Sequence, residues 1–366
     1  MPRYKFEKIA FNSTEKKKPV EADKETYLGL EHLDTGCLKV SRWGAEVAPI
    51  GDKLVMRKGD VLFGRRRAYQ KKVAIAPFDG IFSAHGMVLR PNLEVVTERF
   101  FPFFISSDYF LDAAIKISVG SLSPTINWRD LKELEFNLPP IEKQDVLADE
   151  LWAFEETKEA YSGLMSATDA LVKSQFIEMF GDPVTNPKGW RKETLEQNAV
   201  LLNGRAYKQD ELLDSGKWPV LRVGNFFSNR GWYYSDLDLD EDKYCDNGDL
   251  LFAWSASFGP RIWNGGKVIY HYHIWKVLVG GEYNKDFLCN LLELSTASLM
   301  EDTHGIAMMH LTKSGVEKSL FIVPPLDLQE KYIAFVESIN KSKFALQQNI
   351  ERLEMCRNAL MQKAFG

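Results

Sequence analysis

One stretch near the middle of the chain constrains the fold most, because it has about forty residues without proline and a regular spacing of apolar side chains. It opens at Pro139-Pro140 and ends at Phe180-Gly181. Ten positions lie alternately four and three residues apart, which is the spacing of one stripe along an α-helix. The stripe consists of Leu147, Leu151, Phe154, Lys158, Tyr161, Met165, Thr168, Val172, Gln175 and Met179. Such a helix is about 60 Å long and needs a partner for its stripe.

The same pattern returns 185 positions later in the chain. The second stretch opens at Pro324-Pro325 and ends at Phe365-Gly366. Its stripe consists of Tyr332, Val336, Ile339, Lys343, Leu346, Ile350, Leu353, Arg357, Leu360 and Ala364. Because the same offset also relates Gly120 to Gly305 and Gln144 to Gln329, we interpret the chain as a duplication.

The duplication predicts an α+β protein with two repeated mixed α/β domains, each followed by one long helix. We expect domains at 1–138 and 182–323, and helices at 139–181 and 324–366, which pair as a coiled-coil spacer. The side chains expected to hold the two helices together are Leu151, Phe154, Tyr161, Met165, Val336, Ile339, Ile350 and Leu353.

Composition limits the classes of partner and the compartment. The net charge of −5 gives no overall attraction to nucleic acid, so such binding would depend on local patches. No apolar run approaches the ~20 residues of a membrane span, and the segment 1–5 leads into no signal-peptide core. Four cysteines, at 37, 245, 289 and 356, form no Cys-x-x-Cys pair and suggest reduced thiols of a cytoplasmic protein.

The most basic stretch lies in the first domain. We expect Gly64–Lys72 to form a loop between two buried strands, Val61–Phe63 and Val73–Ala76. Arginine can clamp phosphate or pair with guanine edges, and tyrosine can stack on a base or sugar. The candidate DNA contacts here are Arg65, Arg66, Arg67, Tyr69, Lys71 and Lys72. The alternative is a solvated basic loop without a ligand.

A small-polar segment, Gly120–Asn127, follows later in the same domain. Hydroxyl and amide side chains in a loop can bond to phosphates or base edges. The candidates are Ser121, Ser123, Thr125 and Asn127. An ordinary Ser/Pro turn explains the same residues.

The second domain repeats the frame with different loop chemistry. Asp246–Phe252 corresponds to the turn and strand at Arg57–Phe63, and Ala253–Arg261 takes the place of the basic loop. Gly305–Lys313 replaces the small-polar segment. The candidate contacts are Trp254, Ser255, Ser257, Arg261, His310, Thr312 and Lys313. Divergent loops on a repeated frame suit two surfaces that recognise different targets.

Five ordered motifs now carry a resemblance that spans nearly the whole chain. They are Gly59–Phe63 with its basic loop, Leu138–Gln144, Phe180–Pro183, Asn186–Trp190 and Pro324–Gln329. In this order they resemble the specificity subunit of a type I restriction-modification enzyme.

The resemblance implies two target-recognition domains related by a pseudo-twofold axis, with antiparallel long helices. Each domain would read one half of a split double-stranded DNA target, and a ~60 Å helix pair spans under two turns of duplex. It also implies two modification subunits that use S-adenosylmethionine and restriction subunits that use ATP and magnesium, in a prokaryotic cytoplasm. This chain itself would hold no cofactor, metal or catalytic residue.

Three alternatives stay open. The chain could serve a type IIB-like restriction-modification enzyme, or act as a scaffold that binds no nucleic acid. It could instead be a stand-alone metal-dependent nuclease that uses Glu241 and Lys243. His271 and His273 could share a metal, but the sequence offers no third ligand at fitting spacing. Asn137–Pro140 only partly matches the Asn-Pro-Pro motif of adenine methyltransferases.

Overall fold

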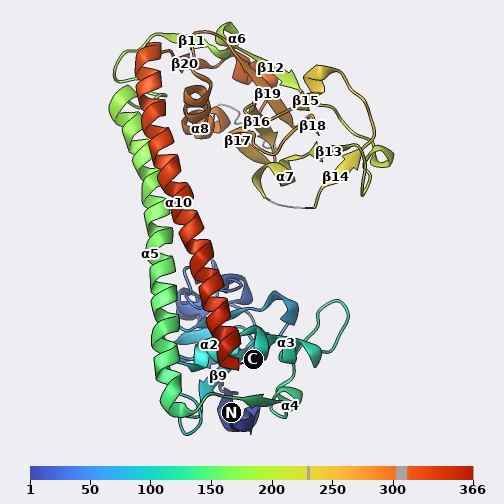
Figure 1. Cartoon of the computed structure of the whole chain (residues 1–366), viewed down its shortest axis with the longest axis vertical. Coiled ribbons are helices and arrows are strands. Elements are labelled where there is room, and N and C mark those ends of the chain that lie inside the picture. Colours follow the sequence, from blue (N-terminus) through green and yellow to red (C-terminus); the bar gives the residue numbers. More distant parts are fainter. Residues whose placement is uncertain (229–230, 302–310, 366) are drawn as a thin grey trace. The chain divides into compact units, whose positions relative to one another are not determined.

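The computed structural model describes residues 1–228, 231–301 and 311–365. They form two compact units, Met1–Gly163 with Gln347–Gly366 (unit 1) and Leu164–Leu346 (unit 2). Figure 1 shows the elements of both units. The expected contact His310 lies outside the described residues, as does the glycine at 305.

Unit 1 contains two four-stranded sheets and one strand pair. The first sheet is antiparallel, in the order β2-β9-β6-β7, and the second has the order β3-β5-β8-β4, with β4 parallel to β8. The strand pair is β1-β10. The strands are β1 (Arg3–Lys5), β2 (Ala10–Ser13), β3 (Lys16–Lys17), β4 (Tyr27–Leu28), β5 (Lys53–Met56), β6 (Val61–Phe63), β7 (Val73–Ile75), β8 (Gly80–Phe82), β9 (Met87–Pro91) and β10 (Glu135–Asn137).

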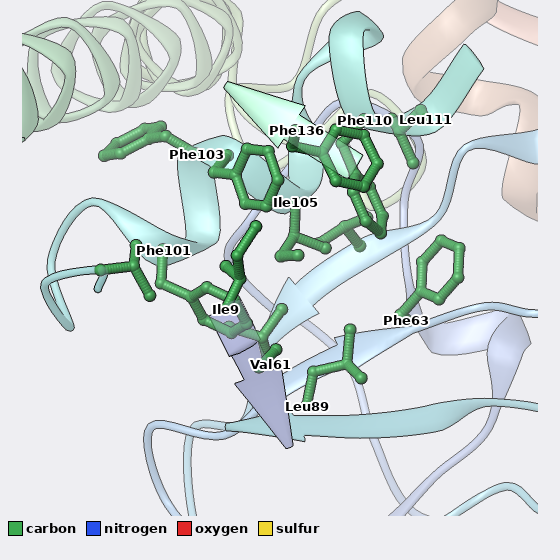
Figure 2. Packing of buried hydrophobic residues seen from close by; sticks show 14 of the residues in the cluster. Ile9, Val61, Phe63, Leu89, Phe101, Phe103, Ile105, Phe110, Leu111 and Phe136 are labelled. Carbon is green, nitrogen blue, oxygen red and sulfur yellow. The ribbon is translucent and has the colours of Figure 1, made fainter. Parts of the chain in front are cut away.

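Short helices cover the first sheet and build an aromatic core (Figure 2). Phe110 lies at the centre, with its ring 5.0 Å from Phe6, 5.4 Å from Phe104 and 5.4 Å from Phe136. The helices are α1 (Phe6–Ile9), α2 (Phe101–Ser106), α3 (Asp108–Lys116) and α4 (Trp128–Leu131), with 3-10 turns η1 (Glu21–Thr26), η2 (Leu30–His32) and η3 (Ala68–Gln70). Such ring contacts add to the burial of apolar area and fix how the helices sit on the sheet.

Unit 2 repeats this architecture. Its antiparallel sheet has the order β12-β19-β16-β17, its second sheet the order β14-β13-β18-β15 with β13 parallel to β18, and its strand pair is β11-β20. The elements are β11 (Lys192–Thr194), α6 (Leu195–Asn198), β12 (Ala199–Asn203), η4 (Gln209–Glu211), β13 (Trp218–Leu221), α7 (Val223–Phe227), β14 (Tyr233–Ser235), η5 (Glu241–Lys243), β15 (Tyr244–Cys245), β16 (Leu250–Ser255), β17 (Ser257–Ile262), β18 (Val268–Tyr270), β19 (Ile274–Val279), α8 (Lys285–Glu301), α9 (Lys313–Lys318) and β20 (Leu320–Ile322). The predicted duplication is therefore confirmed.

The two long helices are α5 (Ile141–Phe180) and α10 (Leu326–Phe365), which begin and end at the offset of 185 positions. Within each unit, the segments of α5 and α10 that belong to it lie side by side and antiparallel (Figure 1). In unit 1, Lys158 pairs with Glu354 (2.6 Å) and Glu155 with Arg357 (2.8 Å). In unit 2, Lys343 pairs with Asp169. All twenty stripe positions are buried or half-buried, so the stripe is the face of each helix that is turned away from solvent.

No helix within the described part of the chain combines the length and the apolar character that a membrane crossing needs.

Candidate nucleic-acid interface

The arginine loop, Gly64–Lys72, joins β6 to β7 and contains η3. Arg67 and Lys71, on either side of η3, have left-handed backbones with φ of 54° and 48°. A non-glycine residue adopts this conformation only when its surroundings hold it there, so the loop has a defined path. Arg66, Arg67 and Tyr69 are exposed, and Arg65 is half-buried.

The arginine loop is joined to the serine loop, Gly120–Asn127, through backbone hydrogen bonds. Arg66 and Thr125 form an isolated β-bridge. The Ala68 N–H donates to the Pro124 carbonyl (3.2 Å), and the Ile126 N–H donates to the Arg65 carbonyl (3.0 Å). The structure thus brings together the two predicted loops of the first domain. Within the serine loop, Ser121 is exposed, whereas Ser123, Thr125 and Asn127 are half-buried.

His85, in the turn between β8 and β9, also belongs to this surface. Its carbonyl accepts from the Arg66 N–H (3.2 Å), and its Nε2 lies 3.3 Å from Arg66 Nη1. Partial burial lowers the pKa of His85, and the charges of Arg66, Arg65 and Lys53 lower it further. A neutral imidazole beside a guanidinium can accept its hydrogen bond. No sequence pattern links His85 with Arg66.

The two lysines of the arginine loop support its shape. Lys71 Nζ lies 2.6 Å from Asp108 and 2.7 Å from Asp112, both on α3. Lys72 Nζ donates to the Leu30 carbonyl (2.6 Å). These contacts hold both lysines against the domain, and Arg66, Arg67 and Tyr69 form the exposed part of the loop.

The segment that replaces the arginine loop in the second domain is a hairpin rather than a loop, which corrects the expectation. Strands β16 and β17 pair from Leu250↔Ile262 to Ser255↔Ser257, and Ala256 makes the turn with φ of 64°. A cross-strand aromatic pair, Trp254↔Phe258, favours the extension of both strands.

The expected contacts on this hairpin have different environments. Trp254 stacks on Trp275 (5.7 Å, 17°), and its indole N–H donates to the Tyr272 carbonyl (2.8 Å). Ser255 is buried and Ser257 exposed. Arg261 lies over the rings of Phe226 and Phe227, and its Nη1 donates to the Phe226 carbonyl (2.6 Å). The Arg261 guanidinium is therefore bound within its own domain.

The two remaining expected contacts lie at the start of α9. The Thr312 hydroxyl accepts from the Gly315 N–H (3.2 Å) and caps the helix. Lys313 pairs with Glu317 (3.4 Å), four residues later. This is a local helix-start arrangement, and it leaves both side chains at the protein surface.

A pocket of 690 Å³ opens beside the turn of the hairpin in the second domain. Ser255 and Ala256 form one wall, and the turn residues His271 and His273 form another. The remaining lining comprises Asp214, Arg222, Val223, Gly224, Asn225, Gly231, Trp232 and Tyr233. We call it the Arg222 pocket. None of its members outside the hairpin was predicted as a DNA contact.

The nuclease alternative receives no structural support from the described residues. Lys243 pairs with its neighbour Asp242 (2.6 Å), and Glu241 pairs with Lys267 (3.5 Å). In the described ranges, no three His, Cys, Asp or Glu side chains lie close enough together to hold a metal ion.

Burial, together with the charges of His273 and Arg222, lowers the pKa of His271 to about 4.

Comparison with known families agrees with this structure, in which the sheets are repeated, the long helices are paired, and the arginine loop of one domain corresponds to the hairpin of the other. Residues 14–163 and 187–354 match the family described as Type I restriction modification DNA specificity domain. The chain belongs to this family. The match covers both globular domains and much of both long helices.

Individual members are distant in sequence. The specificity subunit of the type I restriction enzyme EcoBI from Escherichia coli is 24% identical over 182 residues, which is 48% of this chain and 38% of that subunit. The specificity subunit of the MjaIX enzyme from Methanocaldococcus jannaschii is 23% identical over 310 residues, covering 75% and 70% of the two chains. A solved chain from a study of type I restriction-modification complex assembly shares the fold, with a TM-score of 0.59, 18% identity and coverage of 100% and 97%.

Proposed function

We propose that this chain recognises a bipartite DNA target, two half-sites separated by an unread spacer, as the specificity subunit of a type I restriction-modification system. The observation that carries the proposal is a duplicated domain whose two copies present different chemistry at the same corner of the sheet. In the first copy this corner is the arginine loop; in the second it is the aromatic hairpin. Membership of the specificity family supports the same function.

The first domain, 1–138, binds its half-site through Arg65, Arg66, Arg67 and Tyr69, with the serine loop beside them. The second domain, 182–323, binds the other half-site around Trp254 and Ser257. Guanidinium groups on a braced loop can contact phosphates and guanine edges without a large ordering cost.

The chain performs no chemistry in this proposal. Two modification subunits bind S-adenosylmethionine and methylate adenine, and restriction subunits use ATP and magnesium. The chain directs these prokaryotic, cytoplasmic partners to the target. The paired helices α5 and α10 set the separation of the half-sites.

Methylation mapping tests this proposal directly. The full chain, assembled with its modification subunits, is incubated with genomic DNA, and methylated adenines are located by sequencing. We expect one motif with two defined halves and a spacer of constant length. The triple variant Arg65→Ala, Arg66→Ala, Arg67→Ala should lose the requirement for one half, whereas the matched control Arg3→Ala should not. Methylation without a split motif would refute the proposal.

A further inference from the structure

The two domains have the same arrangement of strands, but the arginines at equivalent corners of this arrangement come from different elements. Strand pairing defines the equivalence: Leu28 pairs with Phe82 in β4-β8, and Leu221 pairs with Tyr270 in β13-β18. The next residue in each case is Gly29 or Arg222. Arg222 thus has no charged equivalent in the first domain.

The turn beside this position is also repeated. The Ser83 N–H donates to the Leu28 carbonyl (2.9 Å), as the His271 N–H donates to the Leu221 carbonyl (2.9 Å). Two residues later, His85 and His273 hold equivalent positions in the turn. In the first domain the arginine at this histidine is Arg66, from the loop after β6. In the second domain, the cation among the described residues that line the pocket is Arg222, which follows β13.

Arg222 is held in an orientation suited to binding. It is exposed, and its guanidinium lies 5.0 Å from the ring centroid of Tyr233. Stacking on an aromatic face orients the guanidinium plane and leaves its edge donors available. Arg261 is also exposed, but its Nη1 already donates to the Phe226 carbonyl (2.6 Å). Among the described residues of the hairpin and its pocket, Arg222 is therefore the better candidate for DNA recognition.

The pocket chemistry favours a base edge over a phosphate. Asp214 is exposed and lines the same pocket, and a carboxylate repels phosphate but accepts a hydrogen bond from the cytosine amino group. Arginine donors match the O6 and N7 acceptors of guanine. Trp232 adds an apolar wall.

We infer that Arg222 reads a guanine edge in the half-site bound by the second domain, with Tyr233 orienting it and Asp214 excluding phosphate. This inference rests on the proposed function and names a recognition residue for it. In the second domain, Arg222 supplies a cation at the corner where Arg66 lies in the first.

The test compares methylation motifs of complexes that contain the full chain. The wild-type motif is determined first, and then those of Arg222→Ala and Arg222→Lys. We expect Arg222→Ala to make one guanine position in one half-site degenerate, lowering discrimination there from roughly 10- to 100-fold to under about 3-fold. Arg222→Lys keeps the charge but loses the planar donor pair, so it should show a partial loss at the same position. It also provides the test if circular dichroism shows that the alanine variant is not folded.

Two control variants distinguish a specific effect of Arg222 on one half-site from a general effect of replacing an exposed arginine. Arg66→Ala should affect only the other half-site, and Arg191→Ala, an exposed arginine of unit 2 paired with Glu193 and Glu282, should leave the motif unchanged. An unchanged motif for both Arg222 variants, or uniformly weaker methylation without a degenerate position, overturns the inference. A wild-type complex without a split motif would instead refute the proposed function.

Discussion

Gln144 and Gln329 lie 185 positions apart and make the same three hydrogen bonds. Both side chains are fully buried near the start of a long helix. Each amide oxygen accepts from one backbone N–H, and each amide nitrogen donates to two carbonyls. The partners are Thr97 N–H (2.8 Å), Val95 O and Pro139 O (3.0 Å each) for Gln144, and Asn284 N–H (2.9 Å), Glu282 O (2.9 Å) and Pro324 O (2.8 Å) for Gln329. The Pro-Pro-x-x-x-Gln motif thus fixes each helix start to its domain.

Replacement of Gln329 by leucine should lower the free energy of unfolding by about 2 to 4 kcal/mol, because one N–H and two carbonyls lose their buried partner. Urea denaturation measures this change. The control Gln347→Leu lies on the same helix but is exposed, and we expect a change below about 0.5 kcal/mol. Equal effects of both variants would contradict the assigned role.

A lysine at Ile350 should destabilise the helix pair in unit 1 by about 3 kcal/mol or more, because Ile350 is buried (8% exposed) on the stripe of α10. Thermal melting followed by circular dichroism at 222 nm is a direct measurement. Met355→Lys, at a position 64% exposed on the same helix, serves as the control and should leave the melting curve unchanged. A wild-type melting curve for Ile350→Lys would refute the pairing role.

Arg66→Ala should weaken binding of the assembled complex to its DNA target by about 1 to 3 kcal/mol if Arg66 contacts a base. If it contacts a phosphate instead, the slope of log K against log salt concentration should become shallower by about 0.9. Fluorescence anisotropy titrations at several salt concentrations distinguish the two. Arg3→Ala, a surface arginine paired with Glu135 (2.9 Å), is the control. Unchanged affinity and slope would remove Arg66 from the interface.

Acidification should destabilise unit 2 through His271. Its folded-state pKa, about 4, lies below the ordinary value of 6.5, so the unfolded chain binds more protons between these values. The contribution of His271 is complete above about pH 6.5 and is lost as the pH falls toward 4. Between pH 7 and pH 5 this amounts to about 1 to 2 kcal/mol.

His271→Asn provides the comparison for the pH dependence, because the asparagine oxygen can accept the His273 N–H that Nδ1 accepts in the wild type (3.4 Å). Urea midpoints at pH 7 and pH 5 should differ less for this variant than for the wild type. Identical differences in the two proteins would show that His271 does not titrate in this range.

The long helices and the duplication were predictable because they depend on local spacing and on a constant offset, both of which a sequence displays. The Pro-Pro pairs located the helix starts to within two residues, at Ile141 and Leu326. Helical periodicity can be recognised in the sequence alone, because it does not depend on knowing the tertiary structure.

The details of the recognition surface were not predictable in the same way. The bridge between Arg66 and Thr125 joins residues far apart in the chain, and no local pattern encodes it. The hairpin at Ala256 needed a left-handed alanine, which sequence propensity disfavours. Arg222 is a single cation after a short strand, and only alignment of the two domains through their strand pairing shows that it faces the same corner as Arg66.

Unit 1 combines residues 1–163 with residues from 347 onward, and this arrangement has a consequence during translation. Phe365 stacks on Tyr109 (5.5 Å) and lies 5.6 Å from Phe100, so the aromatic core of the unit needs a segment made much later. A ribosome adding about 5 to 20 residues per second needs roughly 10 to 40 seconds for the intervening segment. During that interval the apolar surface of the amino-terminal domain that packs against Phe365 in the folded unit lacks its cover.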